Sequence, residues 1–343
     1  MYIYIYIYIY CLAPGWFSVS LSLSLAFAMS YARCLGTLRS RCRIHSHLLR
    51  QCLAEFLGVF LLIVLTLSAS AQSVTSEGTK GNFLSSSLAS GVAVMVAVHV
   101  SGGVSGGHLN PAFSLALCLL AQFPWWKLPL YFLIQVLGAF VGAGTVYLLY
   151  YDAIHSYSNG TLRVTGVRET ASIFATYPAP YLSIPNGFFD QVLGTGVLVL
   201  GILAIIDARN KRIPPGLDPL AVGLLVFALS VSMGANCSCA INPARDLGPR
   251  LFTYVAGWGP QVFSAGQCWW WVPIAAPMLG ATVGTAVYQF GVEFHHPTDS
   301  KEPENSTAEK QGGEKEIDLP VYVVNSYAES WTGAGTESDE PPK

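Results

Sequence analysis

The sequence predicts an all-α membrane protein with six membrane-spanning helices and two re-entrant half-helices, arranged as an inverted repeat. Three observations predict this fold. Of the 343 residues, 52% are hydrophobic and only 11% are charged, whereas soluble domains carry about 25% charged residues. Six apolar stretches are long enough to cross a bilayer, which takes about twenty residues. Two shorter apolar stretches each open with Asn-Pro-Ala in matching places of the two halves.

The chain divides into three parts, and the fold prediction rests on residues 41–296 alone. Residues 1–40 contain alternating Tyr-Ile and Ser-Leu runs. Such alternation favours a strand, but TATATA and TCTCTC repeats encode the same dipeptides. We therefore interpret this part as a disordered or gene-model extension, with Met29 as the expected start. A signal-like segment is the rival interpretation, although no positively charged region precedes its apolar part.

The last part, 297–343, has eleven acidic and four basic residues, a net charge of −7, while the rest of the chain carries +5. Its polar composition with few aromatic residues is typical of a disordered segment. We therefore expect an acidic, disordered cytoplasmic tail after a basic membrane body.

The expected spans follow the long apolar stretches in chain order. They cover residues 52–72, 84–101, 128–150, 188–207, 218–234 and 270–292. The stretches 110–120 and 242–253 are too short to cross. Short, Pro-interrupted apolar pieces in corresponding positions of two halves indicate half-helices of an inverted repeat.

Three short matches relate the two halves, about 50–150 and 188–292. They are EFLG 55–58 with QVLG 191–194, HLNPA 108–112 with AINPA 240–244, and LGAFVG 137–142 with LGATVG 279–284. Their offsets of 136, 132 and 142 residues agree within the length of a loop. Three crossings per half make the second half enter from the opposite side. The half-helices therefore enter from opposite faces and meet at the midplane.

Basic residues set the expected orientation. They precede the first span and fill the 208–217 loop: Arg39, Arg41, Arg43, Arg50, Arg209, Lys211 and Arg212. The positive-inside rule places both segments, and hence both termini, in the cytoplasm. The 151–187 loop is then on the outer side of the membrane, which we expect to be the plasma membrane. It carries the sequon Asn-Gly-Thr at Asn159, a candidate N-glycosylation site, although a tripeptide match is weak evidence.

The Asn-Pro-Ala tripeptides start helices rather than breaking them. Asn is a good N-cap, and Pro is tolerated at the first helical position. The side-chain oxygens of Asn110 and Asn242 then cap their helices, and their NH2 groups point toward one shared place at the midplane. The Gly- and Ser-rich segments before them expose carbonyl oxygens, which are tolerated at membrane depth only against protein or water. This pattern predicts a polar pathway that disfavours cations and protons.

These motifs, over about residues 50–295, resemble the major intrinsic protein, or aquaporin, family. NPARD at 242–246, GPRLFTYVAGWG and GQCWWWVPI are similar to the aquaglyceroporin branch. The resemblance implies an aquaporin-like bundle, a homotetramer in the lipid bilayer, and one passive pore per subunit for glycerol, water and other small neutral solutes.

The resemblance also implies roles for single residues. Asn110 and Asn242 become the central donors, and Arg245 becomes the arginine of the outer constriction, which binds hydroxyls and repels cations. Four residues occupy positions associated with glycerol passage: Asp246, Arg250, Pro277 and Met278. For Asp246 an alternative stays open, because an acid in the first turn of a helix suits the helix dipole.

The expected selectivity filter departs from the pattern of glycerol channels. Ser90, Ser230 and Cys239 are expected around Arg245, where glycerol channels commonly present aromatic side chains. Three small residues predict a wider mouth that also admits urea. A thiol at Cys239 facing the pore predicts block by mercurials.

Glu55 and His108 are ionisable residues at membrane depth, where such residues mark sites by default. One hypothesis gives Glu55 a structural role, in which it binds N–H groups of the re-entrant loop. The other is a pH gate, since histidine titrates near neutral pH and protonated His108 would change its contacts, with Glu55 among them.

Other classes of function fit the sequence less well. An enzyme needs a nucleophile with a base or a metal cluster, and no such set, cofactor motif, metal-ligand spacing or nucleic-acid-binding pattern is present. An active transporter needs a coupling group such as a central carboxylate. A water-selective channel and a junctional or adhesive protein with little transport remain the alternatives.

Overall fold

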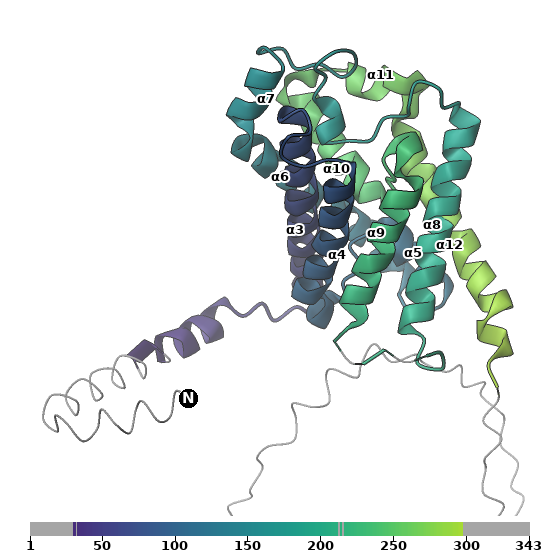
Figure 1. The fold of residues 1–343 in the computed structure, drawn as a ribbon. Helices are drawn as coiled ribbons and strands as arrows, with labels where there is room; N and C mark the ends of the chain where they lie inside the picture. Colours follow the sequence, from purple (N-terminus) through teal and green to yellow (C-terminus); the bar gives the residue numbers. More distant parts are fainter. Residues whose placement is uncertain (1–29, 32, 212, 215, 298–343) are drawn as a thin grey trace, which may run out of the picture. The chain divides into compact units, whose positions relative to one another are not determined.

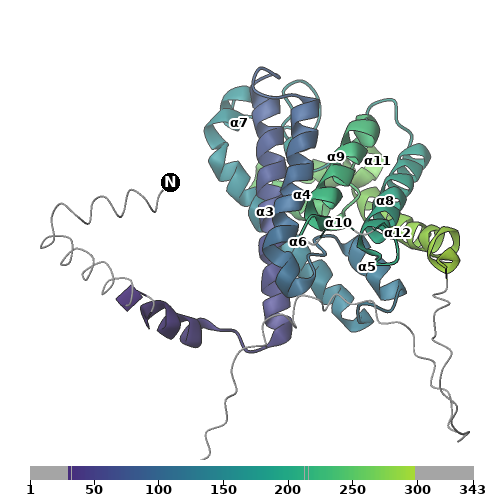
Figure 2. The same cartoon turned by 60° about the horizontal axis from the view of Figure 1, so that its bottom comes forward.

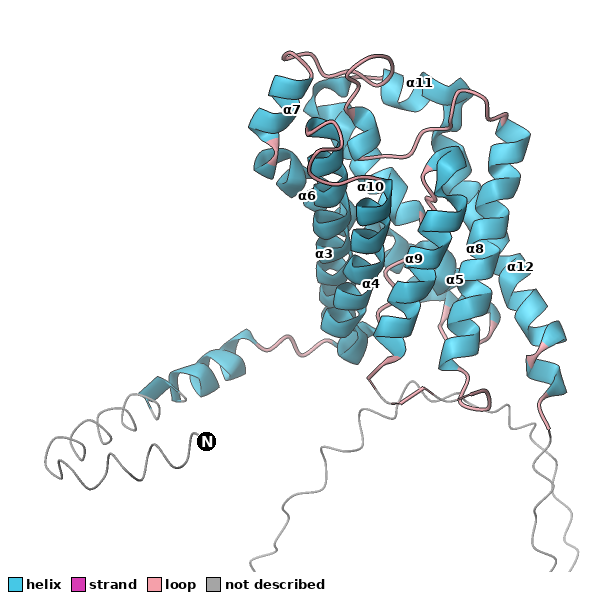
Figure 3. Ribbon diagram, viewed as in Figure 1, coloured by secondary structure: helices cyan, strands magenta, loops and turns pink. Residues whose placement is uncertain are grey.

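The computed structural model describes residues 30–31, 33–211, 213–214 and 216–297, which form helices and loops with no strand among them (Figures 1 and 3). Most of the predicted extension 1–40 and nearly all of the predicted tail 297–343 lie outside these residues. The chain forms two units, Met1–Arg50 and Gln51–Lys343. In the first unit, residues 33–42 are helical. The second unit contains most of the helices.

The six predicted spans are confirmed as long apolar helices. They are α3 (His47–Thr75), α4 (Phe83–Ser105), α6 (Leu128–Leu149), α8 (Ile184–Ile206), α9 (Asp218–Cys237) and α12 (Val272–Gly291). With the short helical turns that adjoin α6 and α12, their mean hydropathy is 1.3 to 2.3, so each is long and apolar enough to cross a membrane.

The two half-helices are α5 (Pro111–Leu119) and α10 (Pro243–Thr253). In Figure 1, α8 and α12 end at the lower face of the bundle, and α7 (Tyr151–Tyr157) and α11 (Gln261–Cys268) lie at the upper face. Helix α4 runs down to the lower face, and α6 starts from the same face and runs up. The segment between α4 and α5 enters the bundle, so α5 must lead the chain back to the lower face. By the same reasoning α10 returns the chain to the upper face.

A reciprocal glycine contact marks the axis between the two halves. A Cβ added at Gly91 of α4 would lie 2.5 Å from the carbonyl oxygen of Gly223 in α9, and one added at Gly223 would lie 2.7 Å from that of Gly91. The two residues are 132 positions apart, the offset of the Asn-Pro-Ala motifs. The backbones of α4 and α9 therefore cross in contact, as small residues allow in membranes.

A second pair of glycines repeats one contact in both halves. In the first, a Cβ at Gly138 would lie 2.6 Å from the carbonyl oxygen of Phe56. In the second, a Cβ at Gly280 would lie 2.4 Å from that of Val192. Helix α6 thus packs on α3 as α12 packs on α8, and Figure 2 shows α8 and α12 side by side. The inverted repeat read from the sequence is therefore present in the packing.

The 151–187 loop folds onto the upper half of the bundle. After α7 it forms a 3-10 turn at Ala171–Ile173, and the side chains that follow are fully buried up to Thr176. The ring of Phe174 packs edge-on against Trp258, with 5.3 Å between centroids. Sequence periodicity does not predict this segment, yet it supplies part of the site described next.

Candidate pore and selectivity filter

The two Asn-Pro-Ala motifs meet through a crosswise exchange of hydrogen bonds. Asn110 Nδ2 donates to the carbonyl oxygen of Ile241, and Asn242 Nδ2 donates to that of Leu109, each at 2.8 Å. Each asparagine also caps its own half-helix, because its Oδ1 accepts from the amide two residues ahead. The caps and the juxtaposition of the two asparagines follow the geometry that the tripeptides predict.

The backbone before each asparagine adopts left-handed conformations. Leu109 has φ of 56° and Ile241 has φ of 35°, which costs a bulky residue about 1–2 kcal/mol. Their carbonyl oxygens accept the crosswise bonds, and their amides are held by side chains from α3 and α8. The surrounding contacts therefore maintain the strain at the centre of the bundle.

In the first half, a buried carboxylate holds the re-entrant segment. Glu55 Oε1 accepts from Ser105 Oγ at 2.6 Å and from the amide of His108 at 2.9 Å. Its Oε2 accepts from the amide of Leu109 and from Gln135 Nε2, both at 2.8 Å. Four donors on a fully buried carboxylate correspond to the structural role that the sequence suggests for Glu55.

The imidazole of His108 faces other groups. Its Nδ1 lies 3.0 Å from Ser114 Oγ, whereas only the backbone amide of His108 reaches Glu55. Three aromatic rings surround the imidazole at centroid distances of 4.7 to 5.8 Å: Phe113, Phe123 and Tyr131. In these two described residues the imidazole of His108 does not contact Glu55; the pH-gate hypothesis proposes that contact for the protonated imidazole alone.

In the second half, Gln191 takes the place of Glu55. Its Oε1 accepts from the amide of Ile241 at 3.0 Å, which repeats the bond from Leu109 to Glu55. Its Nε2 donates to Asp190 Oδ1 and to Cys237 Sγ, each at 3.0 Å. The side chain of Gln191 thus binds one backbone N–H of its re-entrant segment, whereas the carboxylate of Glu55 binds two.

The Arg245 side chain is fixed at one side of the expected filter. Its Nη1 donates to the carbonyl oxygen of Phe174 at 3.0 Å, and its amide donates to Asn242 Oδ1 at 3.2 Å. Cys239 is buried in the segment that joins α9 to α10. Ser90 and Ser230 are half-buried in the upper halves of α4 and α9. All four predicted filter residues therefore lie in the upper half of the bundle.

Asp246 and Arg250 form a buried ion pair, with 2.8 Å between Arg250 Nε and Asp246 Oδ1 and no solvent exposure of either side chain. Asp246 also accepts from the amide of Thr176 at 2.7 Å and from its hydroxyl. Arg250 donates to the carbonyl oxygens of Thr176 and Val262. These two of the four residues expected as the glycerol signature thus bind the upper loop rather than face an open path.

The remaining predicted residues lie apart from these contacts. Pro277 is buried inside α12, and the neighbouring Met278 packs against an apolar cluster of α5, α8 and α9. Asn159 is exposed in a turn of the 151–187 loop, and its Oδ1 accepts from Arg168 at 2.9 Å. Within the described residues, no group of three or more His, Cys, Asp or Glu side chains is placed to hold a metal ion.

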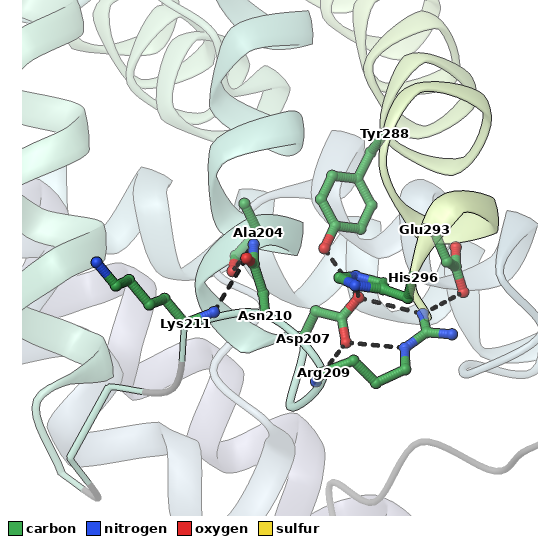
Figure 4. A network of polar contacts seen from close by, with 8 residues as sticks. All are labelled: Ala204, Asp207, Arg209, Asn210, Lys211, Tyr288, Glu293 and His296. Carbon is green, nitrogen blue, oxygen red and sulfur yellow. Dashed lines mark hydrogen bonds and ion pairs between the residues drawn. The ribbon is translucent and has the colours of Figure 1, made fainter. Parts of the chain in front are cut away.

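A separate network of polar contacts lies at the lower face (Figure 4). Asp207, at the end of α8, accepts from Arg209 at 2.9 to 3.2 Å and from the hydroxyl of Tyr288 at 2.9 Å. His296 Nε2 lies 3.3 Å from the same carboxylate, and Arg209 also pairs with Glu293 at 3.1 Å. Burial alone would raise the pKa of Asp207, but the hydrogen bonds from Arg209 and Tyr288 lower it to about 2.

A family model described as Major intrinsic protein matches residues 43–288. The chain belongs to this family. Human Aquaporin-10 is 59% identical over 85% of this chain and 97% of its own length, and human Aquaporin-9 is 47% identical over 84% and 96%. The X-ray structure of the aquaglyceroporin from Plasmodium falciparum superposes with a TM-score of 0.64 at 33% identity, covering 70% of this chain and 95% of that one.

This major intrinsic protein belongs to the aquaglyceroporin branch of the family and is a channel, not an enzyme. Sequence reasoning missed four residues of its site: Gln135, Phe174, Thr176 and Gln191. A polar Gln135 in an otherwise apolar span was a usable signal. Phe174 acts through its carbonyl group, and no side-chain pattern reveals a backbone acceptor.

Proposed function

We propose that each subunit is a passive pore for glycerol, water and other small neutral solutes that runs between the two re-entrant segments. The crosswise asparagine bonds support this pore most directly. An amide NH2 has two donors, so each asparagine keeps one N–H for a solute hydroxyl or a water molecule. Both donors stand at N-termini of half-helices, whose positive ends disfavour protons and cations.

The residues expected around Arg245 support passage of several small neutral solutes rather than of glycerol alone. Its guanidinium is half-buried, in contrast to the fully buried Arg250, and is available to bind hydroxyl or carbonyl oxygens. Ser90, Ser230 and Cys239, the other residues expected in the filter, have small side chains. A mouth of this kind passes urea as well as glycerol.

The orientation of the channel, its membrane and its assembly are inferred from the charge of its loops and from its family. The basic 208–217 loop favours a cytoplasmic lower face, which puts both termini in the cytoplasm and Asn159 outside as a glycan acceptor. We place the channel in the plasma membrane as a homotetramer. A water-selective channel and a junctional protein with little transport are the alternatives that flux measurements distinguish.

The test is flux of glycerol, urea and water into liposomes that hold the purified chain started at Met29. We expect fast uptake of all three with no proton leak. Ser230→Phe narrows the filter and is expected to lower glycerol uptake about tenfold or more, since excluding a solute costs at least about 1.4 kcal/mol, while water flux persists.

The matched control is Ser232→Phe, on the same helix but exposed and about 200° around it. It is expected to conduct like the unchanged chain. Water flux without glycerol flux would identify a water-selective channel, and absence of both would favour the junctional role.

A further inference from the structure

Three buried residues connect the upper loop to α10, and we call them the outer clamp: Thr176, Asp246 and Arg250. Asp246 accepts from both the amide and the hydroxyl of Thr176, and Arg250 donates to the Thr176 carbonyl oxygen. All three residues are at most 1% exposed. Every polar group of Thr176 is therefore bound by an ion pair that lies out of reach of a solute.

The outer clamp lies next to the group that fixes the filter. Phe174, two residues before Thr176, presents its carbonyl oxygen to Arg245 Nη1 at 3.0 Å. Arg245 precedes Asp246 in α10, so one half-helix turn holds both ends of the same loop segment. A shift of Thr176 relative to Asp246 moves the Phe174 carbonyl and with it the guanidinium.

We propose that Thr176 is the positioning residue through which Asp246 and Arg250 set the width of the filter. The acid at position 246 thus selects solutes without touching them. Its carboxylate fixes the threonine, the threonine fixes the Phe174 carbonyl, and the carbonyl fixes Arg245. This inference rests on the proposed function, because it assigns selectivity to the same pore.

The hydroxyl of Thr176 is the part of the clamp that a conservative substitution can remove. It donates to Asp246 and accepts from Trp269 Nε1 at 3.4 Å. Valine has the same shape without the hydroxyl, so Thr176→Val leaves the Trp269 N–H and one carboxylate lone pair without a partner. Thr176→Ser keeps both bonds.

The experiment measures uptake of glycerol and of a four-carbon polyol in liposomes, per folded channel, for the full chain. We expect Thr176→Val to lower the preference for glycerol over the four-carbon polyol about three- to tenfold. The guanidinium of Arg245 is then no longer held in one place, so the filter no longer has one width. The loss of one buried hydrogen bond changes an equilibrium by about that factor. Thr176→Ser is expected to keep the preference of the unchanged chain. Thr176→Ala gives the same measurement if the valine variant does not fold.

The matched control is Thr285→Val, a buried threonine of α12 whose hydroxyl donates within its own helix to Ala281 at 2.8 Å. A merely structural role for Thr176 would lower the melting midpoint of both valine variants and leave their preferences unchanged, and this result would overturn the proposal. If the unchanged chain shows no glycerol uptake, the proposed function fails. If it takes up glycerol and Thr176→Val keeps the preference, only the role of Thr176 fails.

Discussion

The two re-entrant segments carry out the same task with different chemistry. The inner segment, residues 106–110, is held by a carboxylate that binds two loop amides, while the outer segment, residues 238–242, is held by a glutamine that binds one. The outer segment continues into α10, which is bound to the upper loop through Asp246. The inverted repeat thus fixes where the anchors stand, and each half determines how strongly its own segment is tied.

The same positions also differ in reactivity. The inner segment has His108 where the outer one has Ala240, and the outer segment has Cys239 where the inner one has Gly107. Of these two segments, only the one below the central asparagines carries an imidazole and only the one above them carries a thiol. Changes of pH and thiol reagents are expected to act on opposite ends of one pore.

The largest expected effect is that of Glu55→Leu. It leaves two loop amides without an acceptor inside the bundle and removes the closest acceptor of the Ser105 hydroxyl and of the Gln135 NH2, at a cost of at least about 3–5 kcal/mol. We expect loss of the monodisperse peak in detergent and of all glycerol flux. Glu55→Gln, which keeps an acceptor oxygen, is the control that retains a folded channel with reduced flux. Normal flux in Glu55→Leu would contradict the anchoring role.

A mercurial is expected to remove most of the flux through the outer segment. Cys239 is 8% exposed and is expected to line the filter with Arg245, so a mercury atom bound to its thiol would occupy the filter. Glycerol uptake is expected to fall at least about tenfold, as in any block that costs 1.4 kcal/mol or more. Cys239→Ser is expected to resist the reagent, whereas Cys268→Ser, which replaces an exposed cysteine, stays sensitive. Full uptake after saturating treatment would remove Cys239 from the pore.

Gln191→Leu is expected to cost less than Glu55→Leu, and this ranking tests the comparison directly. It removes the acceptor of a single loop amide, that of Ile241, which costs about 1–3 kcal/mol. The channel is expected to fold, with a lower melting midpoint and a few-fold lower glycerol flux. An effect equal to that of Glu55→Leu would mean that the clamp of the upper loop adds nothing to the outer segment.

His108 is expected to give the inner segment a pH response. Charging an imidazole among three aromatic rings is unfavourable, so protonation drives the ring from this pocket and shifts the segment. Glu55, Lys127 and Tyr131 are the titratable groups nearest to it. We expect glycerol flux to change about twofold as the pH falls from about 7.5 to 5.5, with most of the change in the acid part of this range because the pocket disfavours the charged imidazole. His108→Ala is expected to abolish the response, and pH-independent flux in the unchanged chain would refute the gate.

Most of the fold was predictable from the sequence, because the bilayer requires long apolar helices and the motifs repeat at nearly constant offsets. The meeting of Asn110 and Asn242 was predictable for the same reason, whereas the bond from each NH2 to the opposite loop was not. The contacts of the upper loop were not: Thr176 and Asp246 are 70 residues apart, and the loop has no period. The place of the His108 ring was not predictable, because His108 and Glu55 are 53 residues apart and the sequence does not say which way an imidazole points.

The smallest expected effect concerns the lower face, where Asp207 and Tyr288 form a contact that the first half lacks; Ala71 and Val146 stand at the corresponding positions. The folded-state pKa of Asp207, about 2, lies below its ordinary value near 4. The stabilisation from the ionised Asp207 is therefore present above about pH 4 and is lost as the pH falls toward 2.

Asp207→Asn is expected to lower the free energy of unfolding by about 1 kcal/mol at pH 7, because partial exposure of Arg209 weakens its ion pair with Asp207. Glycerol flux is expected to stay unchanged. The difference in melting midpoint from the unchanged chain is expected to shrink at pH 3, whereas the exposed Asp152→Asn shows no difference at either pH. A constant difference would mean that the pair with Arg209 contributes nothing and that only the shape of the side chain matters.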